Sequence, residues 1–451
     1  MTQQLRLVLI VAILASFVTF LDGSVVGVAL PSIGKQLGGG LVTQQWVNDA
    51  YLITLGTLIL AAGSLSDIFG RKKMLVIGLY GFLVASVLCA VSPTSEMLIL
   101  SRALQGIAGT LLVPSSLALI ISSFEGKAQS KAIGSWTAWT GIAFVIGPLI
   151  GGLMVDFASW RLVFAINIIP ISLALVMLRS LHIKSEASNK KRVDIPGIIL
   201  GILSLGGIVY ALIEQGHYGW QNPLVYGSLI TGFIALVSFV VHERRTPQPM
   251  LPLILFSTRN FSVGNVATFF IYAALSLQGF LLVLFLQQTA HYSAVAAGLT
   301  TIPITIIMFF LSSRFGVLSG TYGPRLFMAI GPILAGCGAL LMLRVRLPTE
   351  YFTQILPGII VFGLGLSMTV APLTSAILGS IKSSQAGIGS AINNAVSRIA
   401  GLIAIAAIGI FIDSDVSLAG FHIGITLCAG LLIFGGIISW IGITNQKQHK
   451  V

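Results

Sequence analysis

The chain carries few charged residues: Asp, Glu, Lys and Arg together make up only 8% of its 451 residues, whereas 56% are hydrophobic. Soluble domains carry about 25% charged residues. With a mean hydropathy of +0.99, no water-soluble fold of this length could hide so much apolar side chain. The three cysteines, Cys89, Cys337 and Cys428, lie within apolar runs and lack disulfide or metal-site spacing. The composition predicts an all-α polytopic membrane protein.

The sequence also lacks the motifs of ATP-driven and catalytic membrane proteins. We find no nucleotide-binding loop, no metal-ligand cluster and no nucleophile paired with a base. The net charge of +12 resembles that of nucleic-acid-binding proteins, but the cations lie in short segments between apolar runs, where topology explains them. We therefore expect no enzyme activity, no cofactor and no nucleic-acid partner, and we expect an ion gradient to supply the energy.

Apolar runs long enough to cross a bilayer, at about 20 residues each, recur along the whole chain. We expect fourteen spans near residues 5–30, 46–66, 74–93, 97–122, 131–155, 161–180, 195–214, 223–242, 260–286, 296–316, 325–345, 351–381, 388–412 and 421–443. Two long polar segments bracket the seventh and eighth spans. The predicted domains are a six-helix bundle (1–180), two additional helices with flanking cytoplasmic loops (181–259) and a second six-helix bundle (260–451).

The distribution of Lys and Arg orients these spans. With the amino terminus inside, twenty of the 25 cations fall in cytoplasmic segments, including Lys382 and Arg398, and four fall outside. Arg102 is assigned to a span. This positive-inside bias predicts that both termini are cytoplasmic.

A short charged turn, GSLSDIFGRKK (63–73), joins the second and third spans. It resembles the loop between helices two and three of the major facilitator superfamily, in which the acid helps close the cytoplasmic side. The resemblance implies that Gly63, Asp67, Gly70 and Arg71 form a conformational switch. The alternative is an ordinary positive-inside hairpin.

The first span contains an acid within LDGSVVGVALP (21–31). A carboxylate inside a span costs on the order of 3 kcal/mol, so it is expected to face a cavity or to bind a proton. The segment resembles the signature of the fourteen-helix drug:proton antiporters. It departs from that signature at two positions: Ser24 stands where the signature has Thr, and Gly27 stands where it has Asn. We therefore assign proton coupling to Asp22. The alternative is that Asp22 caps a local helix break at Gly23.

Two further charged residues are predicted at a similar depth. Asp49 follows Trp46 in the second span, and Arg102 begins an Arg-x-x-Gln-Gly pattern in the fourth. Two nearby carboxylates would help one of them hold a proton, and a cation within a span needs a partner. The superfamily's fourth helix resembles this pattern, with the Arg tied to proton coupling. The alternatives are an acid favoured at a helix N-terminus and an Arg that snorkels.

The fifth span contains GIAFVIGPLIGG (141–152). Its Gly-Pro-x-x-Gly-Gly core resembles the motif that marks antiporters within the superfamily, although Ala143 stands where the first Gly is usual. The resemblance assigns Gly147, Pro148, Gly151 and Gly152 to an antiporter motif and favours export. The alternative is a glycine-rich packing helix without directional meaning.

The spans of the second half contain no acid, so the coupling carboxylates come from the first half. Aromatic and amide side chains suit a lipophilic ligand. We predict substrate contacts at Gln105, Trp139, Tyr272, Gln278, Phe285, Asn393 and Asn394. Packing between helices is the alternative for each.

These observations predict a proton-coupled antiporter in the plasma membrane. It would export lipophilic or cationic drugs by alternating access, with a central site between two bundles. We expect a monomer whose partners are the lipid bilayer and a small lipophilic or cationic substrate. The alternatives are export of an endogenous lipid, siderophore or metabolite by the same fold, and a non-coupled channel or sensor.

Overall fold

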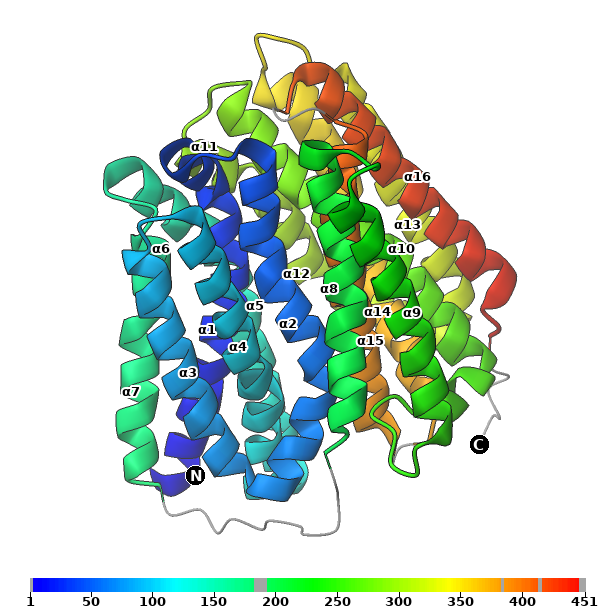
Figure 1. The fold of residues 1–451 in the computed structure, drawn as a ribbon. Helices are drawn as coiled ribbons and strands as arrows, with labels where there is room; N and C mark the ends of the chain where they lie inside the picture. The colour runs from blue at the N-terminus through cyan, green and yellow to red at the C-terminus, as the bar shows by residue number, and fades with distance from the viewer. Residues whose placement is uncertain (1–2, 182–192, 383–384, 413–415, 446–451) are drawn as a thin grey trace. The chain divides into compact units, whose positions relative to one another are not determined.

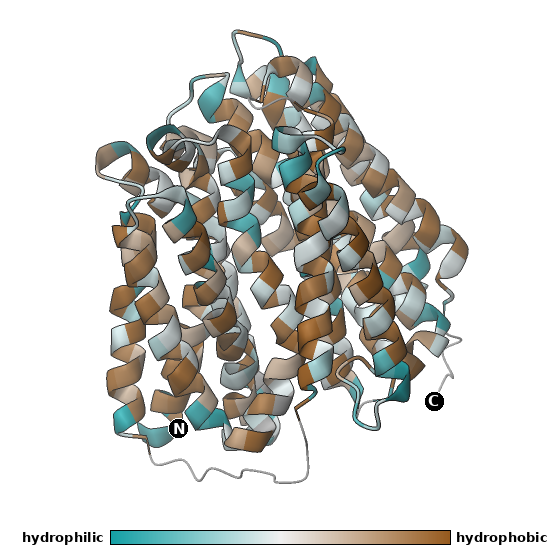
Figure 2. Cartoon of the chain, in the orientation of Figure 1, coloured by the Kyte–Doolittle hydropathy of each residue, from teal (hydrophilic) through white to brown (hydrophobic). Residues whose placement is uncertain are grey.

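The computed structural model describes residues 3–181, 193–382, 385–412 and 416–445, apart from the side chains of Ser64, Asp67, Ser130 and Phe144. Regular structure in this part is helical, with no strand. Fourteen of its helical stretches are long and apolar enough to cross a membrane, which confirms the predicted span number and all-α class. Apolar residues dominate the lengths of these helices (Figure 2).

The chain divides into two compact units, of which the first is Met1–Met250 with Ser293–Gly298. The additional pair α8 and α9 belongs to this unit, and the short segment comes from far along the sequence. Its helices (Figure 1) are α1 (Gln3–Leu37), α2 (Gly40–Phe69), α3 (Arg71–Val91), α4 (Ser95–Ser123), α5 (Gly126–Phe157), α6 (Leu162–Ala165), α7 (Ile168–Arg179), α8 (Ile195–Tyr218), α9 (Pro223–Arg245) and most of α11 (Ala294–Leu299).

The second unit is Leu251–Tyr292 with Leu299–Val451. A π-helical turn opens its α14, and 3-10 turns end α13 and α15. Its elements are η1 (Leu253–Ser257), α10 (Arg259–Gln288), α12 (Ile302–Tyr322), α13 (Pro324–Leu341), η2 (Met342–Arg344), η3 (Tyr351–Ile355), α14 (Leu356–Gly379), α15 (Ala386–Ala407), η5 (Ile408–Ile410) and α16 (Leu418–Gly442).

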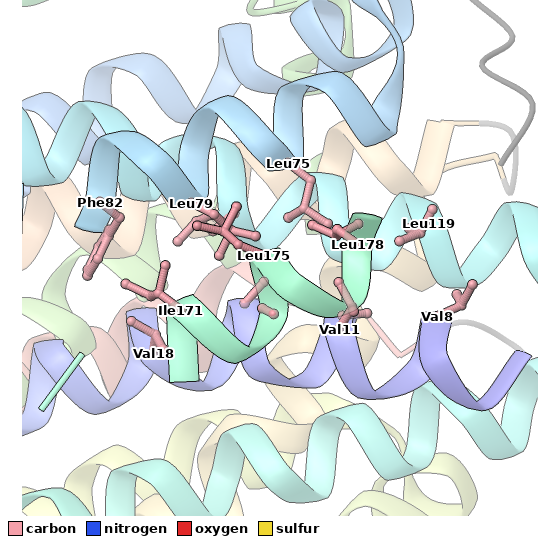
Figure 3. Packing of buried hydrophobic residues seen from close by; sticks show 14 of the residues in the cluster. Val8, Val11, Val18, Leu75, Leu79, Phe82, Leu119, Ile171, Leu175 and Leu178 are labelled. Atoms are coloured by element: carbon pink, nitrogen blue, oxygen red, sulfur yellow. The ribbon is translucent and has the colours of Figure 1, made fainter. Parts of the chain in front are cut away.

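Close packing holds the helices of the first unit together. Lipid tails are as apolar as leucine, so van der Waals contact and small residues drive helix association in a membrane. Buried side chains from α1, α3, α4 and α7 interdigitate (Figure 3). Where α2 meets α4, a Cβ on Gly106 would collide with the Tyr51 carbonyl, and the Thr54 hydroxyl donates to the Ala103 carbonyl at 3.0 Å. A glycine is therefore needed at this crossing.

The additional pair is tied to the rest of the first unit through α2. The Trp46 indole N–H donates to Glu214 of α8 at 2.7 Å. Asp194 caps α8 by accepting from the Gly197 amide at 3.0 Å, and it also contacts His242 of α9 at 2.7 Å. Side-chain hydrogen bonds therefore fix both ends of α8.

The structure corrects the placement of two cations. Arg398 was counted in a cytoplasmic segment, but it lies inside α15, within the span Ala386–Ile410. Arg314, another of the twenty, lies inside α12, within the span Ala294–Tyr322. Eighteen cations then remain in the segments predicted to be cytoplasmic, against four outside, so the predicted orientation is unchanged. The error arose because Arg398 was counted with the loop that precedes its own helix.

Candidate functional site

Asp22 of α1 lies at the centre of a buried polar network in the first unit. Its side chain is 0% exposed. The Asp22 Oδ2 atom lies 2.7 Å from Nη1 of Arg102 on α4. Its Oδ1 atom accepts hydrogen bonds from Gln105 Nε2 and Asn167 Nδ2, each at 2.9 Å. Three donors, one of them a cation, therefore stabilise the ionised carboxylate in this conformation.

Arg102 is held by more than its ion pair. Its Nε donates to the Val47 carbonyl of α2 at 3.1 Å, and Nη1 also donates to Gln105 Oε1 at 2.6 Å. The guanidinium stands 4.3 Å from the centre of the Tyr51 ring and 5.7 Å from that of Phe164. At 1% exposure, it does not snorkel to a membrane surface, so the alternative suggested by its sequence position does not hold.

A second layer of polar groups orients the amides. The Ser86 hydroxyl of α3 accepts from Gln105 Nε2 at 3.0 Å and from Asn167 Nδ2 at 3.4 Å. The Cys89 thiol points at Gln105 Oε1 from 3.7 Å. All four side chains are fully buried. The network therefore links α1, α3 and α4 with the junction between α6 and α7.

Asn167 and Ser86 were not predicted as residues of this site. Asn167 lies where the expected sixth span breaks into α6 and α7, and it precedes the first residue of α7. A polar residue such as Asn167 within an apolar span is a sequence signal for a buried polar site. The direction of the Asn167 side chain, however, depends on the helix break and is not predictable from the sequence. Gln105, which was predicted to contact substrate, is part of the buried network in this conformation, and its contact with substrate stays a prediction.

Asp49 is also fully buried, but it forms no direct hydrogen bond to Asp22 or Arg102 among the described residues. Its Oδ1 accepts from Asn48 Nδ2 at 2.9 Å. Its Oδ2 has no hydrogen-bond partner among the described residues. Arg102, the cation predicted to lie near both acids, pairs with Asp22. Asp22 and Asp49 are thus two fully buried carboxylates of the first unit with very different numbers of donors.

The predicted antiporter motif forms the packing face of α5. A Cβ on Gly147 would overlap the Ser24 hydroxyl of α1, and one on Gly151 would lie 2.5 Å from Val25. On the other side of α5, a Cβ on Gly152 would lie 2.6 Å from the Val295 Cα of α11. The glycines therefore allow α5 to touch both α1 and α11.

The end of α5 also binds the start of α11. Asp156 Oδ1 accepts from the Ala294 amide at 2.9 Å, and its Oδ2 accepts from the Val295 amide at 2.8 Å. A carboxylate satisfies the free N–H groups that begin a helix. The segment 293–298 is thereby fixed to the first unit by the Asp156 side chain and by the close contact at Gly152.

The switch residues predicted between α2 and α3 have mixed placements. Gly70 joins the two helices with φ 91°, a conformation that favours glycine. Gly63 is exposed, and a Cβ there would meet no atom within 4 Å. Arg71 begins α3. The Asp67 side chain lies outside the described part of the chain, so its role as a switch remains a prediction.

The predicted substrate residues fall into buried and exposed groups. Phe285 stacks on Phe421 with ring centres 4.3 Å apart, and Gln278 Nε2 approaches Met342 Sδ at 4.0 Å. Asn393 donates to Asn265 and Thr268 of α10. Trp139 and Asn394, by contrast, are exposed, and Tyr272 is partly exposed.

Comparisons with known proteins identify the family of this chain. The sequence profile described as Major Facilitator Superfamily matches residues 12–405. The "Methylenomycin A resistance protein" of Bacillus subtilis (strain 168) is 31% identical over 96% of this chain and 93% of its own. The "Multidrug resistance protein Stp" of Mycobacterium tuberculosis (strain CDC 1551 / Oshkosh) is 32% identical over 91% and 76%.

Solved structures share the fold at low sequence identity. A crystal structure of the peptide transporter POT with sulfate has a TM-score of 0.72 at 16% identity, covering 97% of this chain and 93% of that one. A D-xylose-proton symporter has a TM-score of 0.69 at 15% identity, covering 99% of both. The chain is therefore a multi-pass membrane transporter, not an enzyme, and it belongs to the Major Facilitator Superfamily.

Proposed function

We propose that the chain is a proton-coupled antiporter that exports lipophilic drugs across the plasma membrane. The observation that carries this proposal is the Asp22–Arg102 pair, at 2.7 Å and fully enclosed within membrane-spanning helices. A buried carboxylate that can exchange a cation partner for a proton is the simplest device for coupling H⁺ to a conformational change.

Protonation of Asp22 would remove the charge that holds Arg102. The hydrogen bonds from Gln105 and Asn167 to Oδ1 would also weaken, because they are charge-assisted only while the carboxylate is ionised. In this conformation the carboxylate is closed off from water. A proton therefore reaches it only when the network opens, as alternating access requires.

Asp49 would be the second proton site. A buried carboxylate with one amide donor and no cation is costly in its ionised form. Its Oδ2 has no hydrogen-bond partner among the described residues, so a proton on this atom would lower that cost. We propose that Asp22 couples the proton to Arg102 and that Asp49 stores a proton in the same unit.

The names of the relatives support drug export. Relatives spanning nearly the whole chain are named for resistance to methylenomycin A and puromycin. Eighteen cations in or beside the segments predicted to be cytoplasmic, against four in or beside those predicted to be outside, support cytoplasmic termini.

The test is drug accumulation in proteoliposomes under an imposed pH gradient, with methylenomycin A and puromycin as probes. We expect accumulation of at least one drug that a protonophore abolishes. Asp22→Asn should lose this accumulation. Glu96→Gln, which changes a carboxylate exposed at the start of α4, is the matched control and should keep it.

Two results would contradict the proposal. One is gradient-driven accumulation by Asp22→Asn at the parental rate. The other is that the pH gradient moves neither drug, although the purified protein is folded.

A further inference from the structure

Arg398 lies at the middle of a membrane span. The span Ala386–Ile410 contains α15 and places twelve residues on either side of Arg398. At 1.5 Å per residue, each end of the span is about 18 Å away. An arginine side chain snorkels to a membrane surface only from near a helix end. The guanidinium of Arg398 therefore stays within the membrane interior.

This cation has no counter-charge in the described part of its unit. No hydrogen bond or ion pair to its guanidinium is found there, and the helices α10 and α12–α16 contain no Asp or Glu. Arg102, the buried cation of the first unit, has a carboxylate, an amide oxygen and a backbone carbonyl. An Arg within a span normally pairs or faces a water-filled cavity, so Arg398 needs an anion from elsewhere.

The surroundings of Arg398 are polar and open on one side. Asn394, one turn earlier on the same helix face, is exposed, and Arg398 itself is partly exposed. Leu402, one turn later, is fully buried. Helix α15 packs against α10, which carries the partly exposed Tyr272. Arg398 thus stands at the inner limit of the exposed part of this helix face, one turn from an exposed amide.

We propose that Arg398 is the receptor for the anionic group of the exported substrate, and that the substrate class is an amphiphilic organic acid. A carboxylate matches the guanidinium fork with two parallel hydrogen bonds. The exposed Asn394 amide, one turn earlier on α15, would be a further donor to this group. The inference rests on the proposed export function and names its substrate class. A cationic substrate, expected from the aromatic and amide residues alone, would meet repulsion here.

Arg314 shows what an arginine without such a role looks like. It lies on α12 only eight residues before Tyr322, about 12 Å from the helix end. Its side chain is exposed, so it lies within easier reach of a membrane surface. Because it is a second in-span arginine of the same unit, Arg314 is the matched control for Arg398.

The test is equilibrium binding to the purified full chain in nanodiscs with three matched probes: 1-naphthylacetate, its methyl ester and 1-naphthylmethylammonium. These share one ring system and carry a negative, a zero and a positive charge. We expect 1-naphthylacetate to bind most tightly. Arg398→Gln should weaken it roughly 10- to 100-fold and leave the ester unchanged, whereas Arg398→Lys should give an intermediate loss and Arg314→Gln none.

The inference is overturned if the parental protein binds the ammonium or the ester at least as tightly as the acid, or if Arg398→Gln binds the acid with parental affinity. Thermal unfolding of each variant checks folding, and Arg398→Lys keeps the test decisive if Arg398→Gln does not fold. Binding is measured without a pH gradient, so its outcome is separate from that of the proton-driven accumulation assay. If the proteoliposomes accumulate a drug but the purified protein does not bind 1-naphthylacetate more tightly than the ester and the ammonium, this inference is contradicted. The proposed export function would then still hold.

Discussion

Asn167 and Asp22 are 145 residues apart in sequence, yet the Asn167 amide donates to Asp22 Oδ1 at 2.9 Å. This bond joins the break between α6 and α7 to the middle of α1. Both side chains are fully buried, so the bond forms only when these elements pack as observed. Asn167 therefore reports directly on whether the network is assembled.

Replacing Asn167 by Ala should change the pH dependence of transport. The ionised Asp22 would lose one of three donors, and a hydrogen bond to a charged group contributes about 1.5–3 kcal/mol. We therefore expect the pH profile of drug accumulation to differ from that of the parental protein. A matched substitution at Asn48, which contacts Asp49, should leave the Asp22-dependent limb of the profile in place. An unchanged profile in Asn167→Ala would contradict the role assigned to this bond.

A double-mutant cycle should show strong coupling between Asp22 and Arg102. Removing one partner of a buried pair leaves an uncompensated charge and typically costs about 3–5 kcal/mol. We expect Arg102→Gln to destabilise the protein strongly, because it leaves Asp22 buried with only its amide partners. The double variant Asp22→Asn with Arg102→Gln should recover part of that loss. Unfolding midpoints in one detergent measure the four proteins, and simple additivity would argue against a direct ion pair.

Substitutions of the α5 glycines should separate packing from helix propensity. Ala at Gly152 would place a Cβ 2.6 Å from the Val295 backbone, so α11 must move. Overpacking of this kind costs about 1–3 kcal/mol. Ala at Gly141 of the same helix meets no atom within 4 Å and should be neutral or stabilising by up to about 1 kcal/mol. Equal thermal stabilities of the two variants would refute the close contact between α5 and α11.

Replacing Asp156 by Asn should loosen the start of α11. The Asn amide group offers one acceptor oxygen in place of two and carries no charge, so one of the bonds to Ala294 and Val295 is lost. The expected cost is about 1 kcal/mol. Hydrogen–deuterium exchange at the 294–295 amides should accelerate accordingly, whereas exchange at Gly197, capped by Asp194, stays as it was. Unaltered exchange at 294–295 would exclude the capping role.

The sequence alone predicts features that depend on depth in the membrane. Asp22 and Arg102 are opposite charges in spans, so each is the natural partner of the other, and the structure pairs them. The α5 glycines likewise follow from a motif, because close packing needs small residues wherever the partner lies.

Features that depend on helix rotation or on a local break were not predicted. Asp49 was predicted at a depth similar to that of Asp22, but its hydrogen bond comes from Asn48. Asn167 joins the network because the sixth span breaks beside it. The position of Arg398 inside a span was not predicted for a different reason. Arg398 was assigned to the cytoplasmic segment before its helix, although it lies within the span Ala386–Ile410.

Proton release on substrate binding tests the central claim most directly. Purified protein in weakly buffered solution is mixed with the drug that the proteoliposomes accumulate fastest, and the pH change is recorded. We predict that the parental protein and Glu96→Gln release protons when the drug binds, and that Asp22→Asn binds the drug but releases none. Proton release by Asp22→Asn equal to that of the parental protein would contradict the account.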